Sequence, residues 1–149
     1  MMNKSLAKNI AREHAEVRGT ILDIRQEIRR LQSEAGPAHE VGNLRKLFAS
    51  FAQHLKRHFE LEEGGGFIGE YPEPGTQRVV KELLGQHRLF ERDLDALLAA
   101  IVSSEEGKAC LSDECAHELE AFLQRLEQHE RAEIDLLQKT VYHETGGGN

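Results

Sequence analysis

Apolar side chains recur at intervals of three and four residues along four long stretches of the chain. This spacing places them on one face of an α-helix, and it predicts helices over about residues 4–34, 38–63, 76–104 and 113–143. The positions expected to face inward are Leu6, Ile10, Val17, Ile21, Ile24, Ile28, Leu31, Leu44, Leu47, Phe48, Phe51, Leu55, Val80, Leu83, Leu84, Leu94, Leu98, Ile101, Cys115, Leu119, Phe122, Leu126, Leu136 and Thr140.

Glycine, proline and polar residues separate the four predicted helices. A Gly-Pro pair at 36–37 ends the first helix, and the glycines at 64–66 end the second. Thr76 is a suitable N-cap for the third helix, and Ser112 for the fourth. Because the connections are short, neighbouring helices should run antiparallel. The sequence therefore predicts an all-α, up-down-up-down four-helix bundle.

Composition narrows the classes of function. The 149 residues carry a net charge of −7, which argues against a nucleic-acid partner because phosphates require a basic face. No apolar run reaches the length of about 18 residues that a transmembrane helix needs. The start of the chain also lacks the apolar core of a secretory signal. We therefore expect a cytoplasmic protein without a membrane partner, with one domain over residues 1–143 and a flexible, glycine-rich tail over 144–149.

Two cysteines, Cys110 and Cys115, are too few for a disulfide framework or a four-thiolate zinc site. We interpret them as a loop thiol and a small core residue.

Several polar side chains fall on the apolar faces of the predicted helices. Each helix contributes a histidine, and the second and fourth add a glutamate one turn later in a His-x-x-x-Glu pair. Burying such groups without partners costs several kcal/mol each, so six of them in one core need a shared partner. The six are His14, His58, Glu62, His87, His129 and Glu133.

Their heights along the bundle agree. His14 and the 58/62 pair lie about 22 and 24 residues from a turn near residue 36. His87 and the 129/133 pair lie about 21 and 23 residues from a turn near residue 108. With a rise of about 1.5 Å per residue, each pair of helices brings three ligands to one level.

Four imidazoles and two carboxylates suit two iron or manganese ions. Zinc would be satisfied with about four ligands. A ferritin-like site needs Glu-x-x-His on two helices, and the one such match, Glu114 with His117, lies off the inward face of its helix. For any single histidine, a core side chain paired with a neighbour remains the alternative.

The order of these residues resembles a hemerythrin-like (HHE cation-binding) domain over about residues 4–143. The motifs are His14, "HLKRHFELEEGGGF", "LLGQHRLFERDL" and "RLEQHERAEIDLL". The resemblance implies a non-haem di-iron centre with an oxo or hydroxo bridge. Glu62 and Glu133 would be bridging carboxylates. The histidines would be terminal ligands, with His14 and His58 grouped apart from His87 and His129.

The sequence departs from the oxygen-carrying hemerythrins. Those proteins have five histidines, whereas this chain has Glu91 where a second histidine of the third helix would stand. The set of four histidines and two glutamates is more similar to iron-centre repair proteins and iron-sensing domains of the same superfamily. Glu91 could be a ligand, an acceptor for an imidazole N–H, or a half-buried ion-pair partner.

Other polar residues near the motifs are interpreted as structural. His54 is expected at the rim of the site, and Glu60, Glu63 and Glu130 on solvated faces. The remaining histidines are expected in loops or on the surface: His39, His117 and His143.

Three classes of function follow. The first is a di-iron protein that binds O2, NO or peroxide for sensing, storage or transport. The second is a di-iron enzyme or iron donor in stress defence, which reduces peroxide or NO or repairs iron centres. The third is a structural bundle with incidental metal. We favour the first, because the ligands explain binding and no further acid or base for catalysis is evident.

Overall fold

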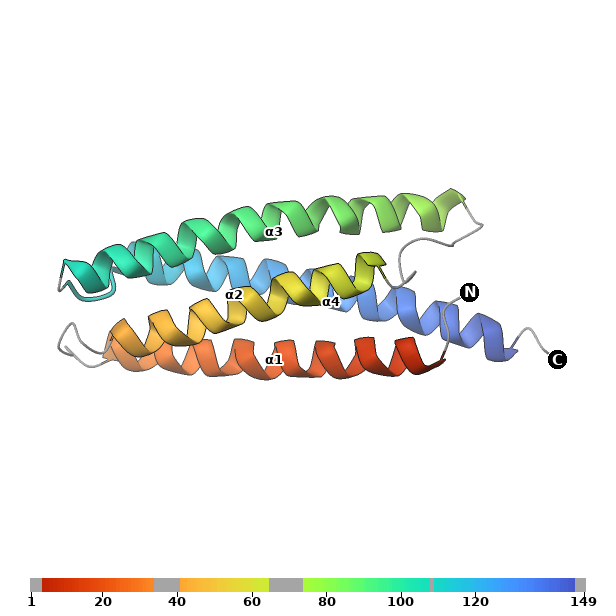
Figure 1. Ribbon diagram of the computed structural model, residues 1–149, viewed down its shortest axis with the longest axis horizontal. Helices are drawn as coiled ribbons and strands as arrows, with labels where there is room; N and C mark the ends of the chain where they lie inside the picture. The colour runs from red at the N-terminus through yellow and green to blue at the C-terminus, as the bar shows by residue number, and fades with distance from the viewer. Residues whose placement is uncertain (1–3, 34–40, 65–73, 108, 147–149) are drawn as a thin grey trace.

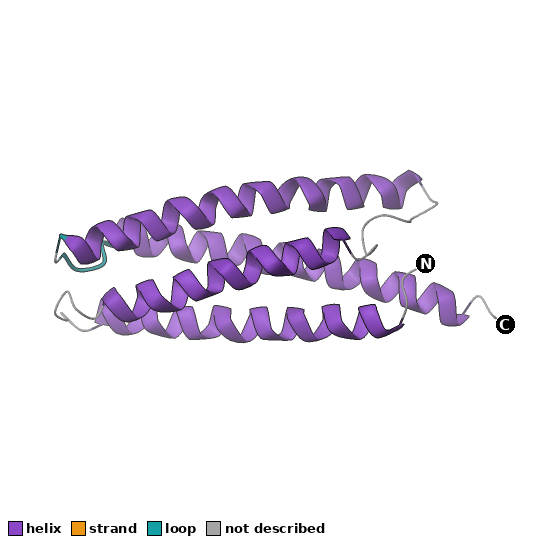
Figure 2. Ribbon diagram, viewed as in Figure 1, coloured by secondary structure: helices purple, strands orange, loops and turns teal. Residues whose placement is uncertain are grey.

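The computed structural model describes residues 4–33, 41–64, 74–107 and 109–146, and every regular element in these ranges is a helix. The helices are α1 (Lys4–Ser33), α2 (Val41–Gly64), α3 (Pro74–Glu106) and α4 (Asp113–Gly146). They lie side by side with alternating direction, and α1 packs against both α2 and α4 while α3 packs against the same two helices (Figures 1 and 2). The predicted four-helix bundle is confirmed.

The helix ends agree with the sequence in part. The backbone N–H of Cys115 donates to Ser112 Oγ at 3.0 Å, so Ser112 caps α4 as predicted. The prediction for Thr76 is wrong, because α3 already begins at Pro74, and proline suits a first helical position. Helix α4 continues to Gly146, so residues 144–146 of the predicted tail are helical. Residues 147–149 lie outside the described ranges.

The core consists of two apolar clusters with a polar layer between them. Val17 and Phe90 belong to the larger cluster, whereas Ile10 and Leu83 belong to the smaller. His14 and His87 lie between these residues in the sequence, at the level where the two clusters meet. The polar layer is thus covered by apolar side chains along the bundle axis in both directions.

The predicted inward faces largely match the buried residues. Of the residues predicted to face inward, Leu31, Leu47, Leu84 and Leu98 are partly buried and pack against the clusters. Leu6 and Thr140 lie where the structure does not describe side chains. Cys115 is buried and Cys110 is exposed, as predicted.

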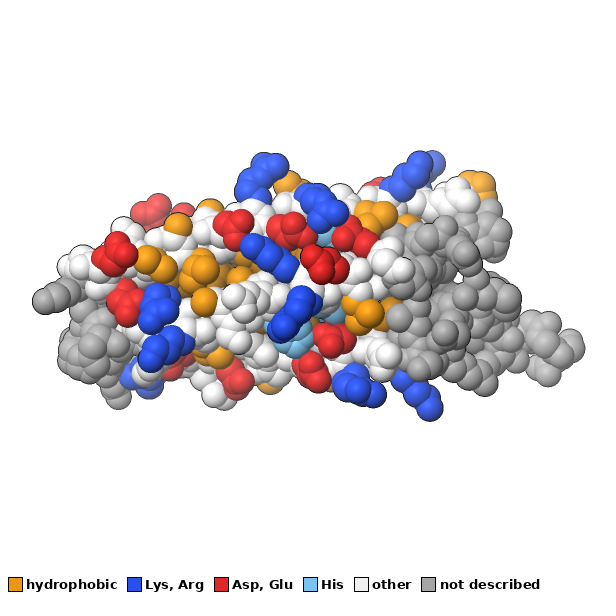
Figure 3. Space-filling model, viewed as in Figure 1, with side chains coloured by type: hydrophobic (Ala, Val, Ile, Leu, Met, Phe, Trp, Pro, Cys, Tyr) orange, Lys and Arg blue, Asp and Glu red, His pale blue; other side chains and the backbone are white. Residues whose placement is uncertain are grey.

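Ion pairs join the helices around the outside of the bundle. Arg25 of α1 binds Glu120 and Glu127 of α4, and Lys56 of α2 binds Asp95 of α3 at 2.8 Å. Acidic and basic side chains are intermixed on the face shown in Figure 3. Among the described residues, no helix has a stretch apolar enough to cross a membrane.

Candidate metal centre

The six predicted site residues meet in the polar layer. Each helix contributes at least one of them, and all six side chains are at most 3% exposed. They divide into two groups of four potential ligands that share two carboxylates. The groups are His14, His58, Glu62 and Glu133, and Glu62, His87, His129 and Glu133.

The histidines form two pairs, as expected. The ring centroids of His14 and His58 are 5.0 Å apart, and those of His87 and His129 are also 5.0 Å apart. One pair joins α1 to α2, and the other joins α3 to α4. The two halves of the centre therefore come from different halves of the chain.

The two shared carboxylates contact imidazoles of both pairs. Glu62 lies 3.4 Å from Nε2 of His58 and 3.4 Å from Nε2 of His87. Glu133 lies 3.4 Å from Nε2 of His14 and 3.2 Å from Nε2 of His129. Each shared carboxylate therefore lies between the two histidine pairs.

The spacing of these atoms suits ligands around an ion better than direct hydrogen bonds. Most of the nitrogen–oxygen distances between the imidazoles and the shared carboxylates are 3.4 Å, longer than the usual 2.7–3.2 Å of N–H···O hydrogen bonds. Two atoms bound to one ion at about 2.1 Å are about 3.0 Å apart at a right angle and about 3.4 Å apart at a tetrahedral angle.

Many atoms of the layer have no hydrogen-bond partner within the protein. They include both ring nitrogens of His14 and of His58, both carboxylate oxygens of Glu62, Nε2 of His129 and Oε1 of Glu133. Because unpaired buried polar atoms are costly, a cluster of this size indicates a missing partner. A cation fits the set, since its members are imidazole and carboxylate groups, which are metal ligands.

Three of the histidines are also contacted on the side away from the centre. His129 donates from Nδ1 to the amide oxygen of Gln86 at 2.6 Å. Nδ1 of His87 lies 3.7 Å from Glu63, and Nδ1 of His58 lies 3.9 Å from Glu13. In each ring Nε2 points to the shared carboxylates. Of these contacts only that of Gln86 is a hydrogen bond, and such an outer acceptor fixes the orientation of a metal-binding imidazole.

A family model for the hemerythrin HHE cation-binding domain matches residues 5–141. The chain belongs to the hemerythrin HHE cation-binding family. The match covers all four helices almost completely, and the buried histidine and glutamate clusters of the HHE domain fit its cation-binding character. No curated protein and no solved structure matches the chain at a significant level.

Glu130 is part of the centre of this HHE domain, and the sequence interpretation that placed it on a solvated face is wrong. Its side chain is 2% exposed, and its two oxygens lie 3.0 Å from Nε2 of His14 and 3.4 Å from Nε2 of His58. The missed signal is the seven-residue spacing of Leu123, Glu130 and Leu137, all of which are buried. The buried face of α4 is wider than the series through Leu126.

Glu91 lies outside the centre. Its side chain is 29% exposed and pairs with Arg88 one turn earlier at 2.9 Å. Of the three alternatives for Glu91, the half-buried ion pair is the one observed. Glu63 is likewise half-buried and paired with Arg88, at 3.0 Å, rather than fully solvated.

The remaining histidines follow the predictions where they are described. His54 lies at the rim, 24% exposed, and His117 is exposed. His39 lies outside the described residues, and so does the side chain of His143. Glu60 is exposed, as expected.

In the absence of a bound cation, protonated histidines balance the negative charge of the buried carboxylates. Burial disfavours the charged form of His14, but the carboxylates of Glu130, Glu133 and Glu62 outweigh this effect and raise its pKa to about 12. The pKa of His87 rises to about 9 against the same effect of burial. Burial would raise the pKa of Glu133, but the surrounding imidazoles lower it well below the usual range. Burial would also raise the pKa of Glu130, but His14 and His58 lower it, whereas for Glu62 burial prevails and raises the pKa. Glu130 and Glu133 therefore favour positive charge beside them, which a bound cation would supply.

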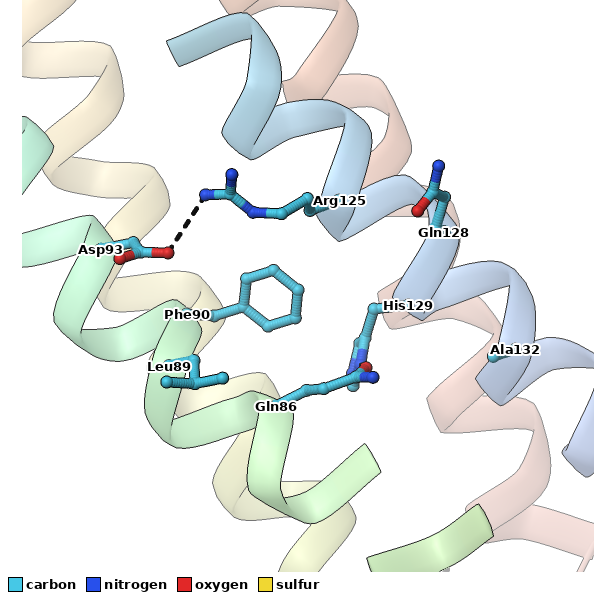
Figure 4. Close-up of a pocket in the computed structure, with 8 residues that line it drawn as sticks. All are labelled: Gln86, Leu89, Phe90, Asp93, Arg125, Gln128, His129 and Ala132. Atoms are coloured by element: carbon cyan, nitrogen blue, oxygen red, sulfur yellow. Dashed lines mark hydrogen bonds and ion pairs between the residues drawn. The ribbon is translucent and has the colours of Figure 1, made fainter. Parts of the chain in front are cut away.

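A pocket of about 360 Å³ opens between α3 and α4 and reaches the rim of the centre (Figure 4). His129 and Gln86 lie side by side in it, with the ring of Phe90 beside them. Arg125 and Asp93 pair across it at 3.1 Å. The pocket adjoins the half of the centre formed by His87 and His129, rather than the half formed by His14 and His58.

Proposed function

We propose that this HHE domain holds two non-haem iron ions and reversibly binds O2 or a related small ligand, NO or peroxide, for sensing, storage or transport. The imidazoles of α1 and α2 would hold one ion and those of α3 and α4 the other. The two shared carboxylates would contribute to both. The ligands are His14, His58, Glu62, His87, His129 and Glu133.

The observation that carries the proposal is the sharing of Glu62 and Glu133. Each carboxylate contacts Nε2 atoms of both histidine pairs at 3.2–3.4 Å. A single four-coordinate ion would leave one imidazole pair unused. Two ions use all four imidazoles and both oxygens of each carboxylate.

Glu130 makes the proposed centre asymmetric. Its oxygens face His14 and His58, so the ion of this half has a third carboxylate within reach. Two six-coordinate ions offer about twelve positions. The four imidazoles would take four, the bridging carboxylates four, a bridging oxygen two, and Glu130 one. The open position would therefore fall in the half formed by His87 and His129.

Ferrous iron with an open coordination position supplies both a binding site for O2 or NO and the electrons that this binding draws on. The protein orients the ligating imidazoles and surrounds them with apolar side chains that exclude water. Phe59 stacks on His87 with ring centroids 4.0 Å apart, and Phe90 packs against His129 at 5.1 Å. Gln86 holds the His129 ring in place through Nδ1.

The pocket between α3 and α4 supports the same assignment of the open side. It reaches the half of the centre with fewer carboxylates, and Phe90, which lines it, is only 5% exposed. We infer that the pocket is the route by which the small ligand arrives.

An enzymatic role, such as reduction of NO or peroxide, is the second candidate. It is favoured by Glu130, because a buried carboxylate that faces His14 and His58 and does not bridge the two halves could accept a proton during a reaction. A binding protein and a reductase differ in one observable. The binding protein releases its ligand unchanged, whereas the reductase consumes it and needs a supply of electrons.

The proposal is tested by adding O2 or NO to anaerobically purified protein and following the optical spectrum. We expect near-ultraviolet and visible bands to appear on addition and to recede when the gas is removed. Glu133→Gln should lose this response, and Glu60→Gln, which changes an exposed glutamate, should retain it. A spectrum that is unchanged by either gas, in protein that contains iron, would contradict small-ligand binding.

A further inference from the structure

A second group of potential metal ligands lies on the surface between α1 and α2. It consists of Glu13, Glu16 and His54, whose ligand atoms all lie within 4.8 Å of one another. Nε2 of His54 lies 2.7 Å from Glu13 and 3.7 Å from Glu16.

The group is connected to the buried centre through Glu13. The Glu13 oxygen that contacts His54 also lies 3.9 Å from Nδ1 of His58. That nitrogen is buried and has no hydrogen-bond partner. The His58 ring therefore faces the surface group with Nδ1 and the centre with Nε2, where Glu62 lies 3.4 Å away.

Exposure falls steadily along this series of ligands. The side chain of Glu16 is 51% exposed, those of Glu13 and His54 are 28% and 24% exposed, and that of His58 is fully buried. An ion that leaves water along this path exchanges water ligands for protein ligands in steps. Surface carboxylates also raise the local concentration of cations.

We propose that Glu13, Glu16 and His54 form a surface site for a divalent cation from which the buried centre is loaded. One imidazole, two carboxylates and water complete a coordination shell for Fe²⁺ or Mn²⁺. An ion bound there would take the place of the hydrogen bond between His54 and Glu13. The surface site stands on its own geometry, whereas its loading role rests on the proposed function of the centre.

An ion pair that only joins α1 to α2 is the competing explanation for this group. The second carboxylate argues against it. Glu16 lies 3.7 Å from a ring nitrogen that Glu13 already contacts at 2.7 Å, so it adds negative charge where one hydrogen bond is already made. A site for a cation accounts for both carboxylates.

The surface site is tested with Mn²⁺ as the probe, added to the iron-loaded protein, because the electron paramagnetic resonance signal of free Mn²⁺ falls when the ion binds. We expect the wild-type chain to take up about one Mn²⁺. The double variant Glu16→Gln/His54→Gln should lose this uptake. Asp23→Asn, which removes an exposed charge elsewhere on α1, should retain it. If the double variant does not fold, Glu16→Gln alone should weaken uptake.

Loading is tested by removing the iron with a chelator and supplying Fe²⁺ again. The double variant should reach the same iron content as the wild type, but about tenfold more slowly or worse. Wild-type protein that takes up no Mn²⁺ would overturn the surface site, and unchanged loading kinetics would overturn its role. Neither result would contradict the proposed function of the buried centre. Conversely, protein that binds Mn²⁺ at the surface but never holds iron in its core would refute the proposed function and leave the surface site standing.

Discussion

An oxygen of Glu130 on α4 lies 3.0 Å from Nε2 of His14 on α1, closer than either shared carboxylate lies to the same atom. Besides the two shared carboxylates, the half formed by His14 and His58 therefore has a third carboxylate, which the half formed by His87 and His129 lacks. The proposed asymmetry of the two ions follows from this relationship.

Removing Glu130 should therefore affect one ion more than the other. We expect Glu130→Gln to lower the iron content from about two per chain towards about one, because the ion between His14 and His58 loses a charged ligand. Elemental analysis checks this result. Glu118→Gln, on the exposed face of α4, is the matched control. If both variants keep the full iron content, Glu130 is not a ligand.

Removing the metal should destabilise the bundle. A ligand present at about 100 times its Kd stabilises the folded state by about 2.7 kcal/mol, and for a domain of this size about 1 kcal/mol corresponds to about 2–4 °C. We expect a chelator to lower Tm by about 5–10 °C, because the buried carboxylates lose the charge that balances them. Calorimetry with and without chelator measures the shift. Equal Tm values would show that the layer does not depend on a cation.

Replacing Glu91 should leave the centre intact. Its carboxylate pairs with the exposed guanidinium of Arg88, and such surface pairs contribute about 0–1 kcal/mol. We expect Glu91→Gln to keep its full iron content and nearly the same Tm, while Glu62→Gln loses iron. Loss of iron from the Glu91 variant would return this residue to the list of ligands.

Replacing Gln86 should weaken metal binding without removing a ligand. Its amide oxygen accepts the Nδ1 proton of His129 at 2.6 Å, and loss of such an outer contact typically lowers metal affinity about 10–100-fold. Competition with a chelator should show this loss in Gln86→Ala. Gln128→Ala is the control, since Gln128 lines the same pocket. Equal affinity in both variants would mean that the Gln86 contact does not orient His129.

The fold and most of the centre could be predicted from the sequence, because both follow from the helical spacing of the residues that face the core. Residues on the apolar face of a helix point to the core, so His14, His58 and His87 were identified by their position in that series. Glu130 could not be identified in the same way. Its neighbours in the sequence are polar and charged, which is typical of an exposed stretch. Its burial depends on the wide buried face that α4 turns towards α1 and α2.

Contacts between side chains of different helices could not be predicted from the sequence, for another reason. Nδ1 of His129 is hydrogen-bonded to Gln86, and Nδ1 of His58 lies nearest Glu13; each of these two neighbours comes from a different helix than its histidine. Their meeting depends on helix rotation and side-chain rotamers, which a spacing rule does not determine. Glu91 shows the reverse case: it lies one turn from His87, yet its side chain turns outward to Arg88.

The most direct test of the central claim is the ratio of iron to protein in the wild-type chain, purified without oxygen and analysed by Mössbauer spectroscopy. The sharing of Glu62 and Glu133 predicts about two irons per chain, in two distinct environments because Glu130 faces only one of them. A single iron per chain, held by four ligands with the other two imidazoles unbound, would contradict the account.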